Sequence, residues 1–306
     1  MIEKKERNKI RVGVLRGGIS KDYRSSLLKG GDIISNIFEN LSEKYKVVDI
    51  LVDKDDVWHL NGLPIKPSDL MYKIDVVWNT SHSNYSKILK DLSIPNIGVG
   101  HFLKILESKE ILENHVKNIE VKIPRSIVFS TYQKDFDGPI EKYAIKKAKE
   151  VMNKFPAPWI VKSFTLDSNT SIHLAKTFGE LVDVVKDGVA HDKSILVEEF
   201  ILGKVSSVHS ISGFRGEDIY VLPPINFSVS EKDKIISLAK NLHIHLGVKY
   251  YLKSDFILHP KLGFFLTNID FSPDFRVDSH LKQSCDYVGA EMHHILDYFL
   301  EKALKI

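Results

Sequence analysis

The segment from Lys253 to Pro273, KSDFILHPKLGFFLTNIDFSP, holds the residues whose types and spacing best suit chemistry. It predicts two strands joined by a turn at residues 259–263. Asp255 lies on the first strand, and Asn268 and Asp270 stand two apart on the second, so both project from one face. Nucleotide enzymes hold Mg²⁺ with one or two carboxylates plus phosphate oxygens. The hairpin is therefore a candidate metal–nucleotide site; on spacing alone, a surface hairpin with solvated side chains is the alternative.

Two lysines are candidates for contact with phosphate. Lys162 lies in the apolar strand WIVKSF, where an ammonium group needs a partner, although a strand-end lysine can also reach water. Lys109 lies in the helical segment ESKEIL, where a solvated lysine is the ordinary outcome. The polar loop at 165–171, TLDSNTS, could cradle a phosphate with hydroxyl and backbone N–H groups, although it lacks glycine.

Two further groups could contact a nucleotide or a substrate. Glu198 and Glu199 end a strand, and the backbone there could read an adenine amino group while Phe200 and Ile201 pack against the ring. A strand that ends in two solvated acids is the alternative. His82, in NTSHSN, can titrate or donate a hydrogen bond near neutral pH, although the chain has 13 histidines.

Bulk composition excludes several classes of protein. A chain of 306 residues is long enough for two or three domains, and a net charge of +3 is too small to indicate binding to nucleic acid or a membrane surface. Cys285 is the only cysteine, which excludes an intrachain disulfide and a thiolate zinc cluster. The N-terminus, MIEKKERNKI, is charged where a signal peptide would be apolar, and no apolar run has the length of a membrane span. We expect a cytoplasmic protein without nucleic acid or membrane partners.

The first hundred residues alternate between strands and helices, which predicts a doubly wound parallel α/β domain at 1–100. Ligands in such domains bind at the carboxyl ends of strands, where the Gly17-Gly18 turn and the segment 79–82 are expected. The predicted strands are 10–16, 46–52, 74–78 and 94–98, and the predicted helices are 25–43 and 85–92.

The rest of the chain predicts a small central α+β domain at 101–190 and a C-terminal α+β domain at 191–306. The hairpin described above lies in the C-terminal domain. The predicted helices are 101–116, 140–155, 179–187, 231–246 and 287–304, and the predicted strands outside the hairpin include 127–129, 159–164, 171–175 and 194–200.

The order of these motifs resembles that of the D-alanine–D-alanine ligase family of the ATP-grasp superfamily, over nearly the whole chain. GVLRGGISKDYRSSLLKGG resembles the family's N-terminal glycine–serine segment, IDVVWNTSHSN its histidine segment, and LSIPNIGVG and LESKEIL its next two motifs. PWIVKSFTLDSNTSI resembles its lysine strand and phosphate loop, ILVEEFILG its adenine hinge, and YLKSDFIL with FLTNIDFSPDF its metal motifs. The resemblance implies an ATP-grasp fold and a divergent member of the family.

The resemblance also implies a reaction. ATP phosphorylates the carboxylate of a first D-alanine, the amine of a second D-alanine attacks the acyl phosphate, and the dipeptide serves peptidoglycan precursor synthesis. Such a site needs Mg²⁺, with Mn²⁺ as the alternative ion, to offset charge on the phosphates. It must also position two amino acid substrates. The resemblance further implies a homodimer.

Residue by residue, the resemblance implies roles at matching positions. Lys109 and Lys162 would contact phosphates, and Glu198, Glu199, Phe200 and Ile201 would surround adenine. Asp255, Asn268 and Asp270 would bind the metal. Lys253 would stand where an arginine steadies the transition state, and the substrates would meet Asp22, His82, Ser168 and Ser279.

The sequence departs from the family at several of these positions. Asn268 and Asp270 nearly exchange the family's glutamate and asparagine, and Lys253 keeps the charge of the arginine without its bidentate fork. Other departures are Asp22 for glutamate, Asn169 for serine, Val205 for the ribose-binding glutamate, Asp274 for glycine, and a short connection at 216–230 in place of a longer mobile loop. These departures keep a second hypothesis open, a noncatalytic or altered-substrate ATP-grasp protein that binds nucleotide without efficient turnover. An unrelated α/β binding protein is the third.

Overall fold

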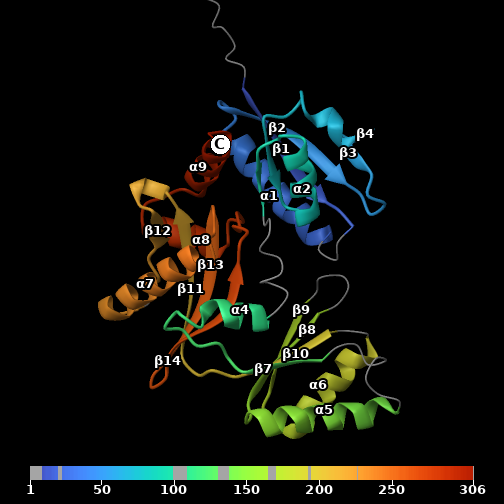
Figure 1. The fold of residues 1–306 in the computed structure, drawn as a ribbon, viewed down its shortest axis with the longest axis vertical. Coiled ribbons are helices and arrows are strands. Elements are labelled where there is room, and N and C mark those ends of the chain that lie inside the picture. The colour runs from blue at the N-terminus through green and yellow to red at the C-terminus, as the bar shows by residue number, and fades with distance from the viewer. Residues whose placement is uncertain are drawn as a thin grey trace, which may run out of the picture. The chain divides into compact units, whose positions relative to one another are not determined.

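The structure is a computed structural model that describes residues 9–19, 23–98, 109–129, 138–164, 170–191, 194–225 and 227–305. The described chain contains three sheets (Figure 1). It divides into two compact units, the first formed by Met1–Glu120, Ser206–Asp255 and Asn268–Ile306, and the second by Val121–Val205 and Phe256–Thr267. The division into three domains at 1–100, 101–190 and 191–306 stays a prediction.

The first sheet has the strand order β4-β3-β2-β1-β5-β6, in which β2, β1, β5 and β6 run parallel. Its strands are β1 (Ile10–Gly17), β2 (Tyr45–Val52), β3 (Trp58–Leu60), β4 (Leu63–Ile65), β5 (Val76–Asn79) and β6 (Asn96–Ile97). The parallel strands match the predicted ones within about two residues at each end. The antiparallel strands β3 and β4 form an edge of the sheet that the sequence does not predict.

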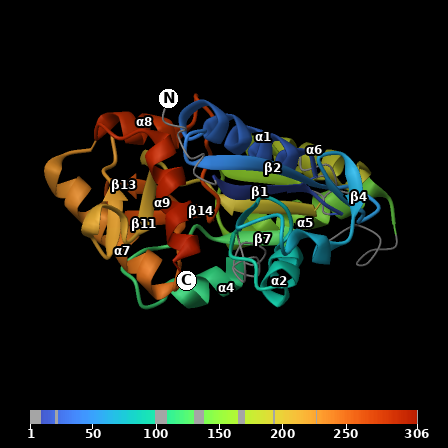
Figure 2. The same cartoon turned by 90° about the horizontal axis from the view of Figure 1, so that it is seen from above.

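Helices cover both faces of this sheet, because its parallel strands are apolar on both sides. On one face, α1 (Tyr23–Asn40) and α9 (Met292–Leu304) pack against residues such as Val12 and Trp78. On the other, α2 (Ser83–Asp91) and the short helix η1 (Pro67–Leu70) pack against residues such as Leu15 and Ile50. Figure 2 shows α1 and α2 on opposite sides of β1 and β2. The predicted doubly wound arrangement is confirmed.

Two glycines form the turn at the carboxyl end of β1. Gly17 and Gly18 have φ angles of +86° and +100°, a region that favours glycine. A Cβ on Gly17 would stand 2.2 Å from the carbonyl oxygen of Val52, and one on Gly18 would stand 2.4 Å from Oγ of Ser81. The turn therefore lies against the loop that follows β5, as the sequence predicts for the carboxyl ends of neighbouring parallel strands.

The second unit contains an antiparallel sheet of order β7-β10-β8-β9 covered by two helices (Figure 1). Its core includes the buried rings of Phe129, Tyr143, Phe155 and Trp159. The elements are β7 (Ser126–Phe129), α5 (Ile140–Lys154), β8 (Trp159–Phe164), β9 (Thr170–Ala175), α6 (Phe178–Ala190) and β10 (Ser194–Glu199).

The third sheet is also four-stranded, with the order β12-β11-β13-β14. Helix α7 packs on β12 and on α4, and the segment that includes α8 and α9 packs into the same core as the first sheet. The strands of this sheet are β11 (Lys204–Ser212), β12 (Ile219–Leu222), β13 (Tyr251–His259) and β14 (Gly263–Asp270). The helices of this region are α4 (Lys109–Val116), η4 (Phe214–Gly216), α7 (Val229–His245), α8 (His280–Tyr287) and α9.

Two predictions for this region need correction. The segment 216–230 is not only a connection, because it contains β12 and the start of α7. The predicted final helix at 287–304 corresponds to α9, which begins only at Met292, because Gly289 adopts a φ of +63° before it; the preceding helix α8 was not predicted. In the described part of the chain, no helix is both long and apolar enough to cross a membrane.

Candidate active site

One face of the third sheet is polar, and it gathers the three predicted metal positions and Lys253. Alternation along β13 puts Tyr251, Lys253 and Asp255 on this face, while Leu252 and Ser254 between them are buried on the other. The neighbouring strands contribute Ser207 and His209 from β11, and Asn268 and Asp270 from β14. We call these seven residues the polar face.

Asp255 is the acceptor at one end of the polar face. Its Oδ1 accepts from Oγ of Ser207 at 2.5 Å, and its Oδ2 accepts from Nδ2 of Asn268 at 3.2 Å. The predicted convergence of Asp255 and Asn268 across the hairpin is therefore present. Rotating the Asn268 amide by half a turn would bring its oxygen beside the carboxylate, so the pair can offer oxygen ligands to a hard cation.

Asp270 follows Asn268 by two positions on β14, and its Oδ1 accepts from the backbone N–H of Ser272 at 2.9 Å. The charge of Asp270 acts on Tyr251 of the same face. Burial is the largest cause that raises the pKa of Tyr251 well above its ordinary value, and the charges of Asp270 and Asp255 follow. No group of three His, Cys, Asp or Glu side chains that could hold a metal occurs in the described residues. A cation here would thus take two carboxylates at most, and phosphate oxygens would complete its shell.

Lys253 lies next to this end of the polar face. Its Nζ is 3.3 Å from Oδ1 of Asp255, and its side chain is about one-third exposed at 29 %. It therefore presents a positive charge beside the carboxylate, and its role in transition-state stabilisation stays a prediction.

A buried hydrogen-bonded chain lies on the other side of Lys253, and sequence reasoning missed it. Nδ1 of His209 lies 2.6 Å from the Tyr251 hydroxyl, and Nε2 of His209 lies 2.8 Å from Nδ1 of His280. Burial lowers the pKa of His209 well below its ordinary value, and burial followed by the charge of Lys253 lowers that of His280. Both rings are therefore neutral near pH 7. The one feature of the sequence that could have indicated this chain is the spacing of Ser207 and His209, which puts both side chains on the same face of one strand.

Ser279, a predicted substrate residue, is buried and serves as the N-cap of α8. Its Oγ accepts from the backbone N–H of Lys282 at 3.2 Å and lies 3.9 Å from Sδ of Met292. Capping of this kind satisfies one of the N–H groups that a helix start leaves without a partner.

The second unit brings two of the predicted nucleotide residues together. Lys162 on β8 forms an ion pair of 2.6 Å with the buried carboxylate of Glu198 on β10. The strand register pairs Lys162 with Leu196, so Lys162 and Glu198 are diagonal neighbours on one face of the sheet. The lysine thus has the partner that its apolar strand demands.

Glu199 faces the other way and binds Arg125. The guanidinium group donates from Nε and Nη2 to the two carboxylate oxygens at 2.9 and 2.8 Å. The backbone N–H of Phe200 donates to the carbonyl of Pro158 at 3.3 Å, and Ile201 is buried at 7 % exposure. Glu198 and Glu199 therefore lie on opposite faces of the strand, and their predicted roles around adenine stay predictions.

His82 lies where the sequence predicts, in the loop after β5. It is the N-cap of α2, and its Nδ1 accepts from the backbone N–H of Asn84 at 3.2 Å. Nearby, Asn79 at the end of β5 donates to Oγ of Ser86 and to the carbonyl of His82.

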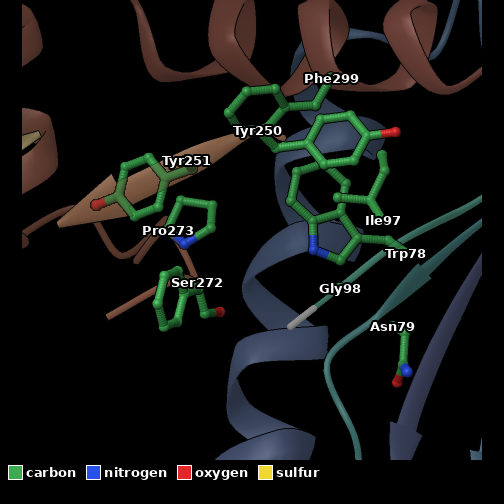
Figure 3. A pocket seen from close by; sticks show the side chains of 10 residues that line it. Trp78, Asn79, Ile97, Gly98, Tyr250, Tyr251, Ser272, Pro273 and Phe299 are labelled. Carbon is green, nitrogen blue, oxygen red and sulfur yellow. The ribbon is translucent and has the colours of Figure 1, made fainter. Parts of the chain in front are cut away.

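A small pocket opens in the first unit at the carboxyl ends of β5 and β6 (Figure 3). Asn79 and Gly98 line one part of it, and Tyr251, Ser272 and Pro273 line another. Tyr251 is thus shared between the pocket wall and the buried hydrogen-bonded chain.

The structure does not describe the side chains of three predicted site residues. Asp22 and Ser168 lie outside the described residues, and Lys109 begins α4 with its side chain outside the described part. Their roles stay predictions.

Comparison with known proteins identifies the fold. No protein-family model matches the sequence. A curated D-alanine–D-alanine ligase of Christiangramia forsetii is 22 % identical over 336 residues, covering 97 % of this chain and 99 % of that protein. The crystal structure of D-alanyl-alanine synthetase A from Vibrio cholerae superposes with a TM-score of 0.75 at 16 % identity, covering 97 % and 99 %. The chain is a divergent relative of the D-alanine–D-alanine ligases. Its fold is the ATP-grasp fold.

A D-alanine–D-alanine ligase from Bacillus anthracis, solved in complex with ATP, matches with a TM-score of 0.67 at 19 % identity over 97 % of this chain and 98 % of that one. The structure shows the surroundings of two residues at which the chain differs from the family's motifs. Val205, at the family's ribose position, is 70 % exposed on β11. Asp274, at the family's glycine, accepts from Nε and Nη2 of Arg276 at 3.0 and 2.7 Å. Burial acts to raise the pKa of Asp274, but these hydrogen bonds hold it below its ordinary value.

Proposed function

We propose that the protein is an ATP-dependent carboxylate–amine ligase of the D-alanine–D-alanine ligase type, which joins two amino acids for peptidoglycan precursor synthesis. The observation that carries the proposal is the convergence of Asp255, Asn268 and Lys253 on the polar face of an ATP-grasp fold. Two oxygen ligands and an adjacent ammonium group suit a phosphoryl transfer, in which charge on phosphate oxygens must be offset.

The donor set of the polar face fits Mg²⁺ or Mn²⁺. Asp255 and Asn268 would hold the ion from adjacent strands, and Asp270 would supply a further carboxylate oxygen. When bound, the ion would neutralise phosphate charge and orient the transferred group. With no group of three carboxylate, histidine or cysteine ligands among the described residues, the ion is expected to bind together with the nucleotide.

The nucleotide would contact residues of the second unit. Lys162 would exchange its ion pair with Glu198 for a phosphate group, leaving Glu198 to accept from the adenine amino group. Phe200 and the buried Ile201 would pack against the ring. Lys109 would add a second positive charge, and Glu199 would position the hinge through Arg125.

The amino acid substrates would meet residues of the first unit. His82 at the carboxyl edge of the first sheet, with Asp22, would contact the first substrate. Ser168 and Ser279 would position the substrates, and Lys253 would stabilise the negative charge that develops during attack by the amine. The protein's natural substrates are D-alanine or a related amino acid.

Phosphate release tests this proposal. Purified protein with ATP and Mg²⁺ is expected to release phosphate and form a dipeptide with D-alanine, or with another member of a panel of D- and L-amino acids and hydroxy acids. Mass spectrometry of the product identifies both substrates. Tight ATP binding without phosphate release for any member of the panel would contradict ligase activity.

That outcome would favour the second candidate, a noncatalytic or altered-substrate ATP-grasp protein. The exposed Val205, which cannot hydrogen-bond a ribose, and Asn268 in place of a bridging carboxylate are the observations that favour it. Assembly is a separate question: a homodimer is proposed from the resemblance, and sedimentation of the purified protein measures it.

A further inference from the structure

The imidazole ring of His280 is held on one side and open on the other. Its Nδ1 lies 2.8 Å from Nε2 of His209 and 3.3 Å from Oγ of Ser284. Among the described residues, none lies within hydrogen-bond distance of its Nε2, and the side chain is partly exposed. The ring therefore has one nitrogen fixed by the protein and one available to a ligand.

The buried neighbours determine which nitrogen of His280 carries the proton. Tyr251 is 2 % exposed and protonated, and its only described partner is Nδ1 of His209 at 2.6 Å. If the tyrosine oxygen accepted from Nδ1–H, its own buried proton would have no described acceptor, which costs about 1–3 kcal/mol. The hydroxyl therefore donates to Nδ1 of His209.

The remaining steps follow from the proton count of a neutral imidazole. His209, whose Nδ1 is an acceptor, carries its single proton on Nε2 and donates it to Nδ1 of His280. His280 then accepts at Nδ1 and carries its own proton on Nε2. The Ser284 hydroxyl, 3.3 Å from the same Nδ1, can donate or accept and is compatible with this tautomer. Tyr251 and His209 thus fix His280 as a hydrogen-bond donor at its open nitrogen.

Charge and position indicate what this donor would bind. His280 lies near Lys253, whose charge contributes to lowering the pKa of the ring. Two donors, an ammonium and an imidazole N–H, suit an anionic oxygen. The charge of Asp255 also acts on the ring, in the opposite direction to that of Lys253 and as the smallest of the three causes. Ser279, the adjacent hydroxyl, is buried and already caps α8.

We infer that Nε2–H of His280 donates a hydrogen bond to the carboxylate of a bound amino acid, and that His209 and Tyr251 are positioning residues that fix its tautomer. This inference rests on the proposed ligase function for the identity of the ligand. The carboxylate belongs either to the first or to the second amino acid, and kinetics separates the two.

The first test reads the tautomer directly and needs no activity. In the ¹⁵N-histidine NMR spectrum of the full chain, we expect His280 to be protonated at Nε2 and unprotonated at Nδ1. In Tyr251→Phe the constraint on His209 is lost, and the His280 resonances are expected to move toward a mixture of tautomers. A wild-type His280 protonated at Nδ1, or a spectrum unchanged by Tyr251→Phe, would overturn the inference.

The second test measures substrate binding. His280→Leu removes the donor, and His280→Gln retains an N–H group near the same place. We expect His280→Leu to raise the KM of one amino acid site about 10- to 100-fold, as loss of a hydrogen bond to a charged group would. The KM for ATP should change little, and His280→Gln should recover part of the loss. Whether the affected KM belongs to the first or to the second amino acid assigns the carboxylate.

A parallel pair tests His209. His209→Gln keeps a donor toward His280 and should retain most of the substrate affinity, whereas His209→Leu should raise the same KM as His280→Leu while circular dichroism verifies folding. An unchanged KM in His280→Leu, with normal turnover, would overturn the inference and leave the ligase function intact. If the wild type forms no dipeptide, the ligase function fails; D-alanine titrated into labelled protein then decides the inference, with a shift of the His280 Nε2 resonance supporting it and no shift overturning it.

Discussion

At the residue scale, the metal chemistry of the polar face depends on Asp255. It accepts from Ser207 and Asn268 and lies beside Lys253, so it is the anionic centre of that end. We expect Asp255→Ala to lower Mg²⁺-dependent affinity for ATP at least about 10-fold, the effect of losing a charge-assisted contact. Calorimetric titration of ATP with and without Mg²⁺ measures this. Asp233→Ala, an exposed acid on α7, is the matched control; equal Mg²⁺ dependence in the two variants would remove Asp255 from the metal site.

A second prediction concerns a buried histidine away from the polar face. His243 has no exposed surface, its Nε2–H donates to the carbonyl of Val248 at 3.0 Å, and its Nδ1 lies 2.8 Å from Oγ of Ser210. Burial, the largest cause, lowers the pKa of His243 from its ordinary 6.5 to about 4. Between these values the unfolded chain binds a proton that the folded chain does not, so the free energy of unfolding falls as pH falls from 7 toward 4.

The expected size is about 2 kcal/mol of unfolding free energy between pH 7 and pH 5. Urea unfolding at both pH values should show that His243→Gln loses this part of the pH dependence, whatever its stability at pH 7. His245→Gln, on the exposed side of the same helix, should keep the wild-type dependence. If the two variants have the same pH dependence, His243 is not the source.

At the scale of an element, the turn after β1 fixes how the first sheet presents its carboxyl edge. Gly17→Ala would put a Cβ 2.2 Å from the Val52 carbonyl at a φ of +86°, so backbone must move. We expect it to lower the free energy of unfolding by more than about 2 kcal/mol. Gly31→Ala, inside α1 with nothing within 4 Å, should instead raise it by up to about 1 kcal/mol. Chemical denaturation compares the two, and a similar loss in both would show that the turn is not constrained.

The sequence predicted those helices and strands whose own residues show an apolar run or a periodic apolar stripe. The apolar runs of β1 and β8 and the stripe of α1 are legible in the sequence and appear close to their expected bounds. Strands β3 and β4 were missed because three-residue strands carry little alternation. The pairing of Lys162 with Glu198 was not predicted, because a diagonal contact depends on the register between β8 and β10, and strand register cannot be read from the sequence.

The hydrogen-bonded chain at the polar face shows the same limit more strongly. His209 and His280 are 71 residues apart, and their contact requires β11 and the start of α8 to meet in space. Asp255 and Asn268 are 13 residues apart across one hairpin, and that contact was predicted. The sequence thus allowed a contact within one hairpin to be predicted, whereas contacts between elements far apart in the chain could be found only in the structure.

At the scale of the whole molecule, the two ends of the chain build one unit. Helix α9 from the C-terminal part packs into the core formed by α1 and the first sheet, and Lys44 pairs with Asp297 and Glu301 of α9 at 2.7 and 2.5 Å. The second unit has its own core, with Tyr143 and Trp159. The two cores are therefore expected to respond separately to mutation.

Phe299 of α9 tests this separation. Its ring is fully buried and lies 6.0 Å from the ring of Trp78 and 5.8 Å from that of Tyr250, centroid to centroid. Phe299→Ala should cost about 3–5 kcal/mol by leaving a cavity in this core. In native-state hydrogen exchange, amides of β1 and β5 should then exchange faster, while those of β8 and β10 should keep their wild-type rates. Phe38→Ala, which removes a phenylalanine that is 74 % exposed on α1 of the same unit, should change neither set. Faster exchange of β8 and β10 in Phe299→Ala, to the same extent as β1 and β5, would mean that the two cores unfold together, because only a shared opening transmits the loss of one buried ring to both.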